Sequence, residues 1–102
     1  MCYELPRTLF ILQTTMFSIY VIKSKSYNKI YIGFTTRDVY LRLEDHNQGK
    51  TISTKDYRPW GLIYFESYRS EKDARKREKM LKHYGNSLTH LKNRIDNSLK
   101  SK

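Results

Sequence analysis

The sequence has almost no cysteine and no long hydrophobic segment. Cys2 is the only cysteine, so no disulfide can form within the chain, and no set of Cys and His residues has the spacing of a structural zinc site. The longest apolar run, Leu9–Leu12, is much too short to cross a bilayer and lacks the features of a secretory signal. We therefore expect a soluble protein of the reducing cytoplasm, with neither a membrane nor a disulfide-linked partner.

Acidic residues are also scarce. The 102 residues include 20 Lys and Arg but only 10 Asp and Glu, which gives a net charge of +10. Eleven of the basic residues and four of the acidic ones lie in residues 69–102. A basic region of this kind attracts a polyanion in a salt-dependent manner, which favours nucleic acid as the partner. Charge alone is equally compatible with basic side chains that only keep two exposed helix faces in solution.

The hydrophobic residues are few but clustered, which indicates one small folded domain. They make up 38% of the chain. Two β-rich runs, Phe17–Ile22 and Lys29–Phe34, flank a short polar segment and predict a hairpin. Because side chains alternate between the two faces of a strand, Tyr20, Tyr31 and Gly33 should share the face opposite the main apolar one.

The remaining pattern predicts three helices and a third strand. The helices are expected at 36–48, 70–84 and 87–99, a loop at 50–60, and the strand at 62–68. Thr35 with Asp38, and Ser70 with Asp73, resemble capping boxes that would start the first two helices. The resulting order is β-β-α-β-α-α, which places the chain in the α+β class.

Several polar residues fall where apolar ones are expected. Glu78 lies on the same helix face as Ala74 and Leu81, and an acid on an inward face needs a partner. That partner could be a neighbouring arginine in an ion pair, or a hard divalent metal ion such as Mg²⁺. Arg42 and His46 are four residues apart and should share one face of the first helix.

Each of these residues also has a plain structural interpretation. An arginine at the edge of a core is often only a salt-bridge partner, and a tyrosine in a strand is usually packing. Taken together, two tyrosines, an arginine, a histidine and a glutamate that have no apolar reason to converge indicate a functional site.

The same residues belong to an ordered set of short motifs. These are Ser18-Ile19-Tyr20, Tyr31-Ile32-Gly33, Arg42 to Asn47, Arg58-Pro59-Trp60 and Ala74 to Glu78. The set resembles the GIY-YIG nuclease domain, although Ser18 stands where that family usually has glycine. The resemblance spans about residues 16–96 and is greatest to the compact stand-alone members related to the nuclease module of the excinuclease C subunit.

The resemblance implies a small three-stranded antiparallel sheet flanked by helices, and a metal-dependent endonuclease that hydrolyses phosphodiester bonds of DNA with low sequence specificity. DNA repair is the expected setting. The ion would be Mg²⁺ or Mn²⁺, held by Glu78. The resemblance assigns catalytic roles to Tyr20, Tyr31, Arg42, His46 and Glu78. Whether Tyr20 or His46 takes the proton of the attacking water is left open.

Substrate contacts are assigned around this set. Gly33 would let a phosphate approach the backbone closely, while Arg75, Lys76 and Lys79 would grip the flanking strand. Asn86, at a helix junction, is chosen over Asn93 as the late polar residue of the site.

The domain is expected to span residues 16–99, between a leader of residues 1–15 and a tail of residues 100–102. Met16 directly precedes the first strand, as if translation started there, so the leader should be dispensable. The Leu9–Leu12 run could instead cover an apolar surface. Two other functions remain open: a nucleic-acid-binding module of the same fold without turnover, and a structural protein whose tyrosines are only core.

Overall fold

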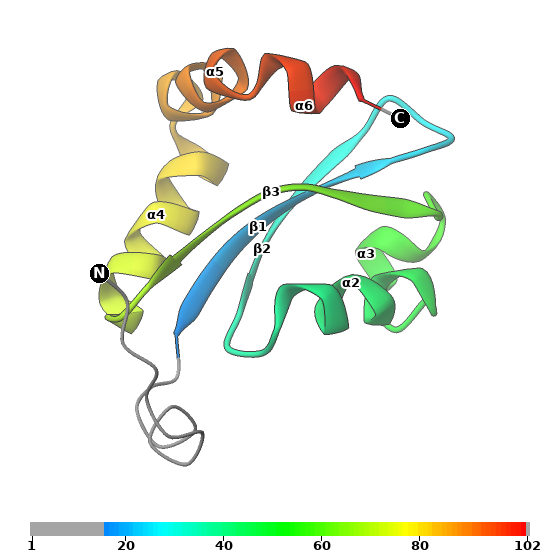
Figure 1. Cartoon of the computed structure of the whole chain (residues 1–102), viewed down its shortest axis with the longest axis horizontal. Helices are drawn as coiled ribbons and strands as arrows, with labels where there is room; N and C mark the ends of the chain where they lie inside the picture. Colours follow the sequence, from blue (N-terminus) through cyan, green and yellow to red (C-terminus); the bar gives the residue numbers. More distant parts are fainter. Residues whose placement is uncertain (1–15, 102) are drawn as a thin grey trace, which may run out of the picture.

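The computed structural model of the chain describes residues 16–101, and its centre is a three-stranded antiparallel sheet. The strands are β1 (Phe17–Ser24), β2 (Ile30–Thr35) and β3 (Trp60–Tyr68), in the spatial order β2-β1-β3. The helices are α2 (Val39–Asn47), α3 (Ile52–Lys55), α4 (Glu71–His83), α5 (Gly85–Arg94) and α6 (Asp96–Lys100). Helices α2 and α3 lie on one side of the sheet, and α4, α5 and α6 lie on the other (Figure 1). The predicted α+β class and the order β-β-α-β-α-α are confirmed.

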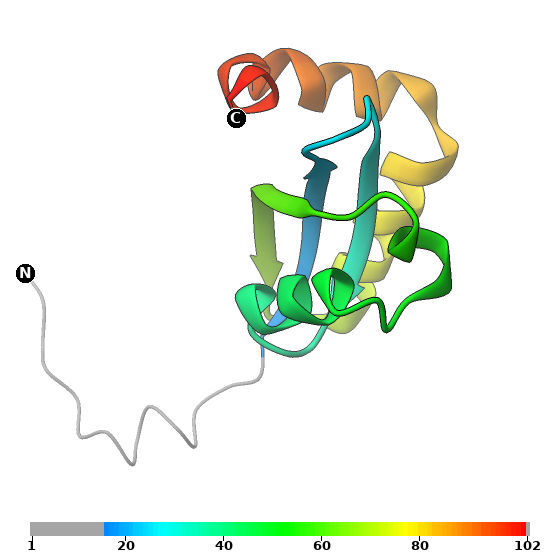
Figure 2. The same ribbon diagram turned by 90° about the vertical axis from the view of Figure 1, so that its right-hand side faces the viewer.

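Each face of the sheet has its own hydrophobic core. One cluster joins Ile19, Val21 and Ile32 of the sheet to the inward residues of α4 and α5. The other contains Tyr20, Ile22, Val39 and Trp60 and lies under α2. Figure 2 shows the sheet from a second direction, with α2 and α5 on different sides of it. The two faces follow the period of two in the strands, so the predicted division of side chains is confirmed.

The first helix begins three residues later than predicted. Thr35 is the last residue of β2, and its hydroxyl accepts a hydrogen bond from the Arg37 N–H at 2.9 Å. Asp38 is the actual cap, because its carboxylate accepts from the N–H groups of Tyr40 (2.8 Å) and Leu41 (3.4 Å). The prediction of a helix from residue 36 with Thr35 as cap was therefore wrong. Ser70 does cap α4, as predicted, by accepting from the Asp73 N–H.

Residues 50–60 are more ordered than the sequence indicates. They contain the short helix α3, and Trp60 already belongs to β3. The Asn47 side chain binds both backbone groups of Trp60, with Oδ1 at 2.6 Å from its N–H and Nδ2 at 3.0 Å from its carbonyl. These bonds join the end of α2 to the start of β3. Because residues 52–55 form α3, the prediction of a loop without helix at 50–60 was wrong.

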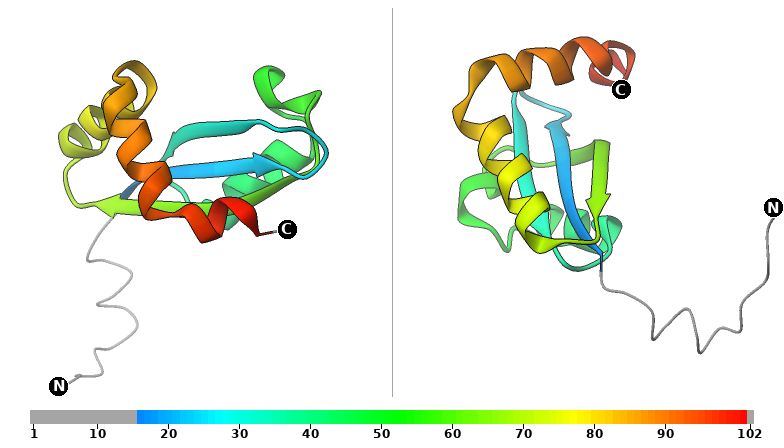
Figure 3. Two further views of the ribbon diagram at one scale, coloured as in Figure 1. Left: turned by 90° about the horizontal axis from the view of Figure 1, so that it is seen from above. Right: turned by 90° about the vertical axis from the view of Figure 1, so that its left-hand side faces the viewer.

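The predicted helix at 87–99 is two helices. The first of them, α5, begins at Gly85, and the chain leaves helical geometry at Ile95, where φ is −111° and ψ is 30°. Ile95 is buried in the core of the α4 side, which fixes the bend at this residue. Seen from above, α5 and α6 pass across the strands (Figure 3). The Lys23 ammonium donates to the Leu99 carbonyl and so joins α6 to β1.

Two predictions concern the ends of the chain. The leader at residues 1–15 lies outside the described residues, as does the last residue of the tail. Lys100, predicted as the first residue of that tail, is the last residue of α6. Across residues 16–101, the helices are all too short or too polar to cross a membrane.

Candidate active site

The centre of the site is a hydrogen bond between Tyr20 and His46. Tyr20 lies in the middle of β1, on the face that α2 covers, and His46 is in the last turn of α2. The Tyr20 hydroxyl oxygen is 2.7 Å from His46 Nε2, and the other ring nitrogen, Nδ1, is 2.8 Å from the Thr54 hydroxyl. Tyr20 is 1% exposed and His46 is 0% exposed. A buried hydroxyl and imidazole held on both sides cannot change orientation freely.

Burial determines the charge states of this pair. Burial, assisted by the positive charge of Arg42, lowers the pKa of His46 to about 4. Burial also raises the pKa of Tyr20 to about 12, although the guanidinium of Arg42 acts in the opposite direction. At neutral pH the imidazole is therefore neutral and the phenol is protonated. One nitrogen of the histidine is free to accept the phenol's hydrogen.

Tyr31 packs against both members of this pair. Its ring centroid is 5.1 Å from that of His46 and 6.4 Å from that of Tyr20. The Lys82 ammonium of α4 lies 5.7 Å from the Tyr31 ring centroid. Tyr31 is only partly buried, so it forms a wall of the site between the sheet and the end of α4.

Arg42 lies one turn before His46 on α2, and the structure brings it to the same site. Its guanidinium is 3.4 Å from an Asp45 carboxylate oxygen and 3.4 Å from the Thr51 hydroxyl. Asp45 is also paired with Arg37 at 2.7 Å and Lys50 at 3.3 Å. Burial alone would raise the pKa of Asp45, but the hydrogen bonds from Lys50 and Arg37 outweigh it and keep this pKa below its usual value. Asp45 is therefore ionised at neutral pH and helps to orient Arg42.

Glu78 lies on α4 with its side chain only 16% exposed. Its carboxylate oxygens are 3.0 Å from Lys82 Nζ and 3.6 Å from the Arg75 guanidinium, both on the same helix. The ion pair with Arg75 is thus one of the two partners that the sequence allowed for Glu78, the other being a metal ion. The charge of Glu78 also acts on the pKa of Tyr20, although more weakly than that of Arg42. The glutamate thus lies at the side of the site formed by Tyr31 and Lys82.

The donor set at Glu78 fits one kind of metal ion. Within residues 16–101, no three His, Cys, Asp or Glu side chains gather into a metal-binding group. A single carboxylate is a poor site for zinc or copper, which need several ligands. It does suit Mg²⁺ or Mn²⁺, which keep several water ligands and often take the rest from substrate phosphates.

Gly33 is required by the position of Tyr20. The two residues are direct partners in the β1–β2 register. A Cβ atom on Gly33 would lie 2.3 Å from both Cζ and the hydroxyl oxygen of Tyr20. The Tyr20 phenol therefore uses the space that the missing side chain leaves. The phosphate contact assigned to Gly33 stays a prediction.

Replacing Gly33 by Ala should displace the Tyr20 ring. We expect a loss of about 1–3 kcal/mol in the free energy of unfolding, as for other overpacked sites. Urea titrations would measure this loss. Gly85→Ala is the matched control, because a Cβ there meets nothing within 4 Å. A Gly33→Ala protein as stable as the parent would contradict the close packing of Tyr20 on Gly33.

The other predicted contact residues lie on the surface of α4 and α5. Lys76 and Lys79 are exposed on α4, and Asn86 is exposed near the start of α5, as is Asn93 further along that helix. Arg75 is also exposed, but its guanidinium stacks 3.6 Å above the Phe34 ring and lies 3.5 Å from the Glu71 carboxylate. Their roles in binding stay predictions.

Four residues of the site were missed from the sequence: Asp45, Thr51, Thr54 and Lys82. Two of them carry a readable signal, since Asp45 follows Arg42 by three residues and Lys82 follows Glu78 by four, and both spacings bring side chains together on a helix. Thr51 and Thr54 carry none, because their contacts depend on how α3 folds back against α2.

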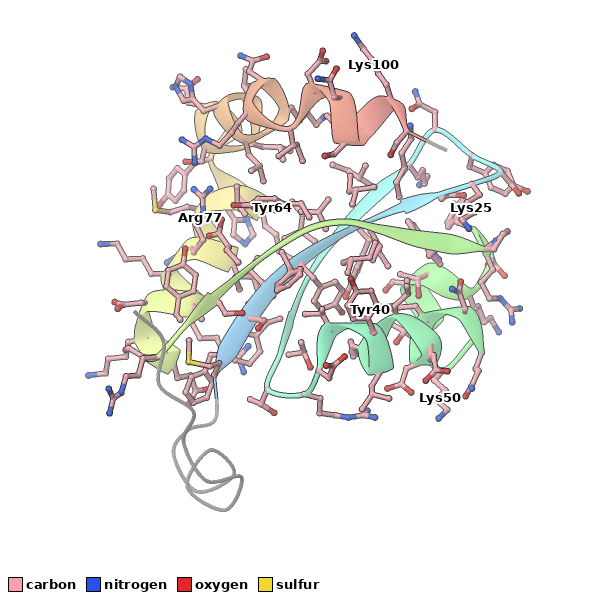
Figure 4. The ribbon with its side chains drawn as sticks, viewed as in Figure 1. Lys25, Tyr40, Lys50, Tyr64, Arg77 and Lys100 are labelled. Carbon is pink, nitrogen blue, oxygen red and sulfur yellow. The ribbon has the colours of Figure 1, made fainter. Side chains whose placement is uncertain are left out.

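A second polar cluster lies on the opposite face of the sheet. The Glu66 carboxylate accepts hydrogen bonds from the hydroxyls of Tyr64 and Tyr68 and from Arg77, whose Nε is 2.7 Å away. Figure 4 shows Tyr64 and Arg77 close together between β3 and α4. Every partner of the carboxylate is thus a donor from β3 or α4, which is the arrangement of a structural ion pair.

The low pKa of His46 predicts a specific loss of stability in acid. In the unfolded chain this pKa is near 6.5, and in the folded protein it is about 4. Between these values only the unfolded state takes up the proton, so stability falls as the pH drops below about 6.5. We expect His46 to lower the free energy of unfolding by about 2 kcal/mol between pH 7.5 and pH 5.

Urea titrations at a series of pH values would measure this loss. His46→Gln should lack this component, whereas the control His83→Gln, at an exposed position, should keep it. Identical pH dependence in the parent and His46→Gln would show that His46 is not the group responsible.

Comparison with known proteins gives the same family as the motifs. The family described as "GIY-YIG catalytic domain" matches residues 16–95. A UPF0213 protein of Staphylococcus haemolyticus (strain JCSC1435) is 40% identical over 65 residues, which are 63% of this chain and 77% of that protein. A UPF0213 protein of Staphylococcus aureus (strain N315) is 39% identical over 67 residues, 65% of this chain and 79% of that protein.

Among solved structures, the solution NMR structure of a UPF0213 protein from Bacillus halodurans is similar, with a TM-score of 0.48 and 24% identity. The match covers 83% of this chain and 94% of the Bacillus halodurans chain. The family match includes every residue of the Tyr20–His46 site described above. The chain therefore belongs to the GIY-YIG family.

Proposed function

We propose that the protein is a divalent-metal-dependent endonuclease that hydrolyses phosphodiester bonds of DNA with low sequence specificity. The observation that carries the proposal is the buried hydrogen bond of 2.7 Å between Tyr20 and His46, with the Arg42 guanidinium beside it. A buried structural tyrosine needs one hydrogen-bond partner for its hydroxyl, but it does not also need an arginine there. A phosphodiesterase needs both a proton acceptor and a fixed positive charge.

The chain's own groups would act in the following way. The Tyr20 oxygen orients the attacking water and accepts its proton as the phenol hydrogen moves to His46 Nε2. Arg42 neutralises charge on the phosphoryl oxygens in the transition state, and Tyr31 forms a wall of the site. The metal ion, when bound to Glu78, would polarise the phosphate and stabilise the leaving oxygen.

The basic face of α4 would hold the DNA. Lys76 and Lys79 are exposed and have no ion pair among residues 16–101, so their charges are available to phosphates. Contacts of this kind position a duplex without reading its sequence, which is the reason to expect low specificity. A role in DNA repair within the cytoplasm, based on the resemblance to the excinuclease module, is part of the proposal.

Removal of the Tyr20 hydroxyl tests the proposal. Tyr20→Phe keeps the ring in its core, and we expect cleavage about 10²- to 10⁴-fold slower, the range for loss of general acid–base catalysis. The measurement is single-turnover cleavage of a labelled DNA duplex with the protein in excess. Leaving His46 Nε2 without its donor should cost about 1–3 kcal/mol of stability, so a thermal melt must accompany the assay.

Tyr68→Phe is the matched control, because it removes another hydroxyl of raised pKa from the opposite face of the sheet. It should cut DNA at the parental rate. If folded Tyr20→Phe cuts as fast as Tyr68→Phe, the tyrosine is only packing and the proposed mechanism is wrong.

A further inference from the structure

The short helix α3 and its cap residue Thr51 contact two of the polar residues that α2 contributes to the site, Arg42 and His46. The Thr54 hydroxyl is 2.8 Å from His46 Nδ1, and the Thr51 hydroxyl is 3.4 Å from the Arg42 guanidinium. Thr54 is 0% exposed, so no water competes for its hydroxyl. Neither threonine belongs to the motifs that indicate the family. Residues 51–54 therefore hold the Arg42 and His46 side chains in place by hydrogen bonds.

The hydrogen bonds of Thr54 define which histidine nitrogen carries the hydrogen. The Thr54 hydroxyl donates to the Thr51 carbonyl at 3.3 Å, and a carbonyl can only accept. With its single hydrogen used there, the hydroxyl accepts from His46 Nδ1–H. Nε2 is then left without a hydrogen and accepts from the Tyr20 hydroxyl.

The surroundings of Tyr20 agree with this direction. Arg42, whose charge acts on the Tyr20 phenol, can only donate hydrogen bonds. A phenol oxygen beside such a donor directs its own hydrogen away, and His46 Nε2 lies at hydrogen-bonding distance to receive it. The hydrogens thus run in one direction, from Tyr20 to His46 to Thr54 to the Thr51 carbonyl.

Thr54 is itself held firmly. The Trp60 indole N–H donates to the Thr54 carbonyl at 2.9 Å, and Asn47 binds the Trp60 backbone on both sides. Trp60 is buried in the core under α2. The position of the Thr54 hydroxyl is therefore fixed to α2, the helix that carries His46, and to the start of β3.

We propose that Thr54 is a positioning residue that keeps His46 in its Nδ1–H tautomer, so that Nε2 is the nitrogen that receives the Tyr20 proton. The catalytic part of this inference rests on the proposed nuclease function. The tautomer itself does not, because it is a property of the folded protein. Without the hydroxyl, the imidazole would gain by placing its hydrogen on Nε2 and donating to the Tyr20 oxygen, which reverses the bond that proton transfer needs.

The direct test is ¹⁵N NMR of the histidine rings at neutral pH. The parent should show His46 as the Nδ1–H tautomer. Thr54→Val, which has the same shape without the hydroxyl, should move His46 toward the Nε2–H tautomer. Thr54→Ser, which keeps the hydroxyl, should retain the parental spectrum. Thr89→Val, at an exposed position on α5, is the matched control and should change nothing.

Cleavage rates complete the test. Thr54→Val should cut DNA about 10- to 100-fold more slowly than the parent, the usual effect of removing a group that orients a catalytic side chain, and Thr54→Ser should restore most of the rate. Thermal melts identify the folded variants. A merely structural Thr54 would predict a lower melting temperature for Thr54→Val with an unchanged tautomer and an unchanged rate for the folded fraction.

Two outcomes would overturn the proposal: an Nε2–H tautomer of His46 in the parent, or a folded Thr54→Val with the parental tautomer and rate. A parent that shows the Nδ1–H tautomer but cleaves no DNA would overturn the nuclease function instead. In that case the control of the tautomer by Thr54 is still decided by the spectra of Thr54→Val and Thr54→Ser.

Discussion

Glu78→Gln should cut DNA about 10²- to 10⁴-fold more slowly than the parent in Mg²⁺, while it folds normally and binds DNA at least as well. Glutamine keeps the size of the side chain but removes the charge that would hold the ion, and loss of metal catalysis is worth several kcal/mol. Less negative charge on α4 cannot repel phosphate. The measurement combines single-turnover cleavage with fluorescence anisotropy of a labelled duplex and a thermal melt.

Glu71→Gln is the matched control for this variant. Glu71 is also on α4 and also pairs with Arg75, but its side chain is 56% exposed and it is in the first turn of the helix, whereas Lys82 is in the last. The Glu71→Gln variant should cleave DNA at the parental rate. If Glu78 is only half of a structural ion pair, Glu78→Gln should lower stability and the folded fraction should still cut DNA. Parental cleavage by folded Glu78→Gln would refute the metal assignment.

Arg42→Ala is expected to slow cleavage about 10²- to 10³-fold, the usual effect of deleting one preorganised group that stabilises charge in a transition state. The Arg42 guanidinium opposes the rise in the pKa of Tyr20 through both its charge and a hydrogen bond, so it acts directly on the hydroxyl that would take the proton. Affinity for Mg²⁺ should persist because Glu78 is untouched. Single-turnover rates at saturating Mg²⁺ would measure the effect.

Arg37→Ala separates the catalytic role from a structural one. Arg37 pairs with the same Asp45 carboxylate, at 2.7 Å, but its side chain is 55% exposed and, among the described residues, it makes no hydrogen bond to Tyr20 or His46. Both variants remove one cation from Asp45 and should have similar effects on stability. Equal rates in Arg42→Ala and Arg37→Ala would mean that Arg42 is only a salt-bridge partner.

The sequence was informative where a regular period determines the direction of side chains. Alternation in the strands separated Tyr20, Tyr31 and Gly33 from the main apolar face, and the four-residue spacing placed Arg42 and His46 on one face of a helix. Both inferences are confirmed by the two cores and by the position of Arg42 and His46 beside Tyr20. The periods predict faces of single elements, and the resemblance to the family predicts that these faces and Glu78 form one site.

The parts that were missed depend on contacts without a period. The short helix α3 is determined by Asn47, Trp60 and Thr54, which bind one another through backbone and side-chain hydrogen bonds. Such bonds leave no repeating pattern in residues 50–60. Similarly, the start of α2 depended on whether Thr35 or Asp38 caps it, and the carboxylate that reaches two N–H groups is the cap. Which of two neighbouring side chains caps a helix depends on the local backbone geometry, which the sequence pattern does not give.

The most direct test of the central claim is cleavage by the unmodified chain of 102 residues. Duplex, nicked and flap DNA of unrelated sequences would be incubated with it in Mg²⁺ and, in parallel, in excess EDTA. The account predicts cleavage in Mg²⁺ with little dependence on sequence, and none with the chelator. If the protein binds these substrates tightly and leaves all of them intact in both Mg²⁺ and Mn²⁺, it is a binding module without turnover, and the claim is wrong.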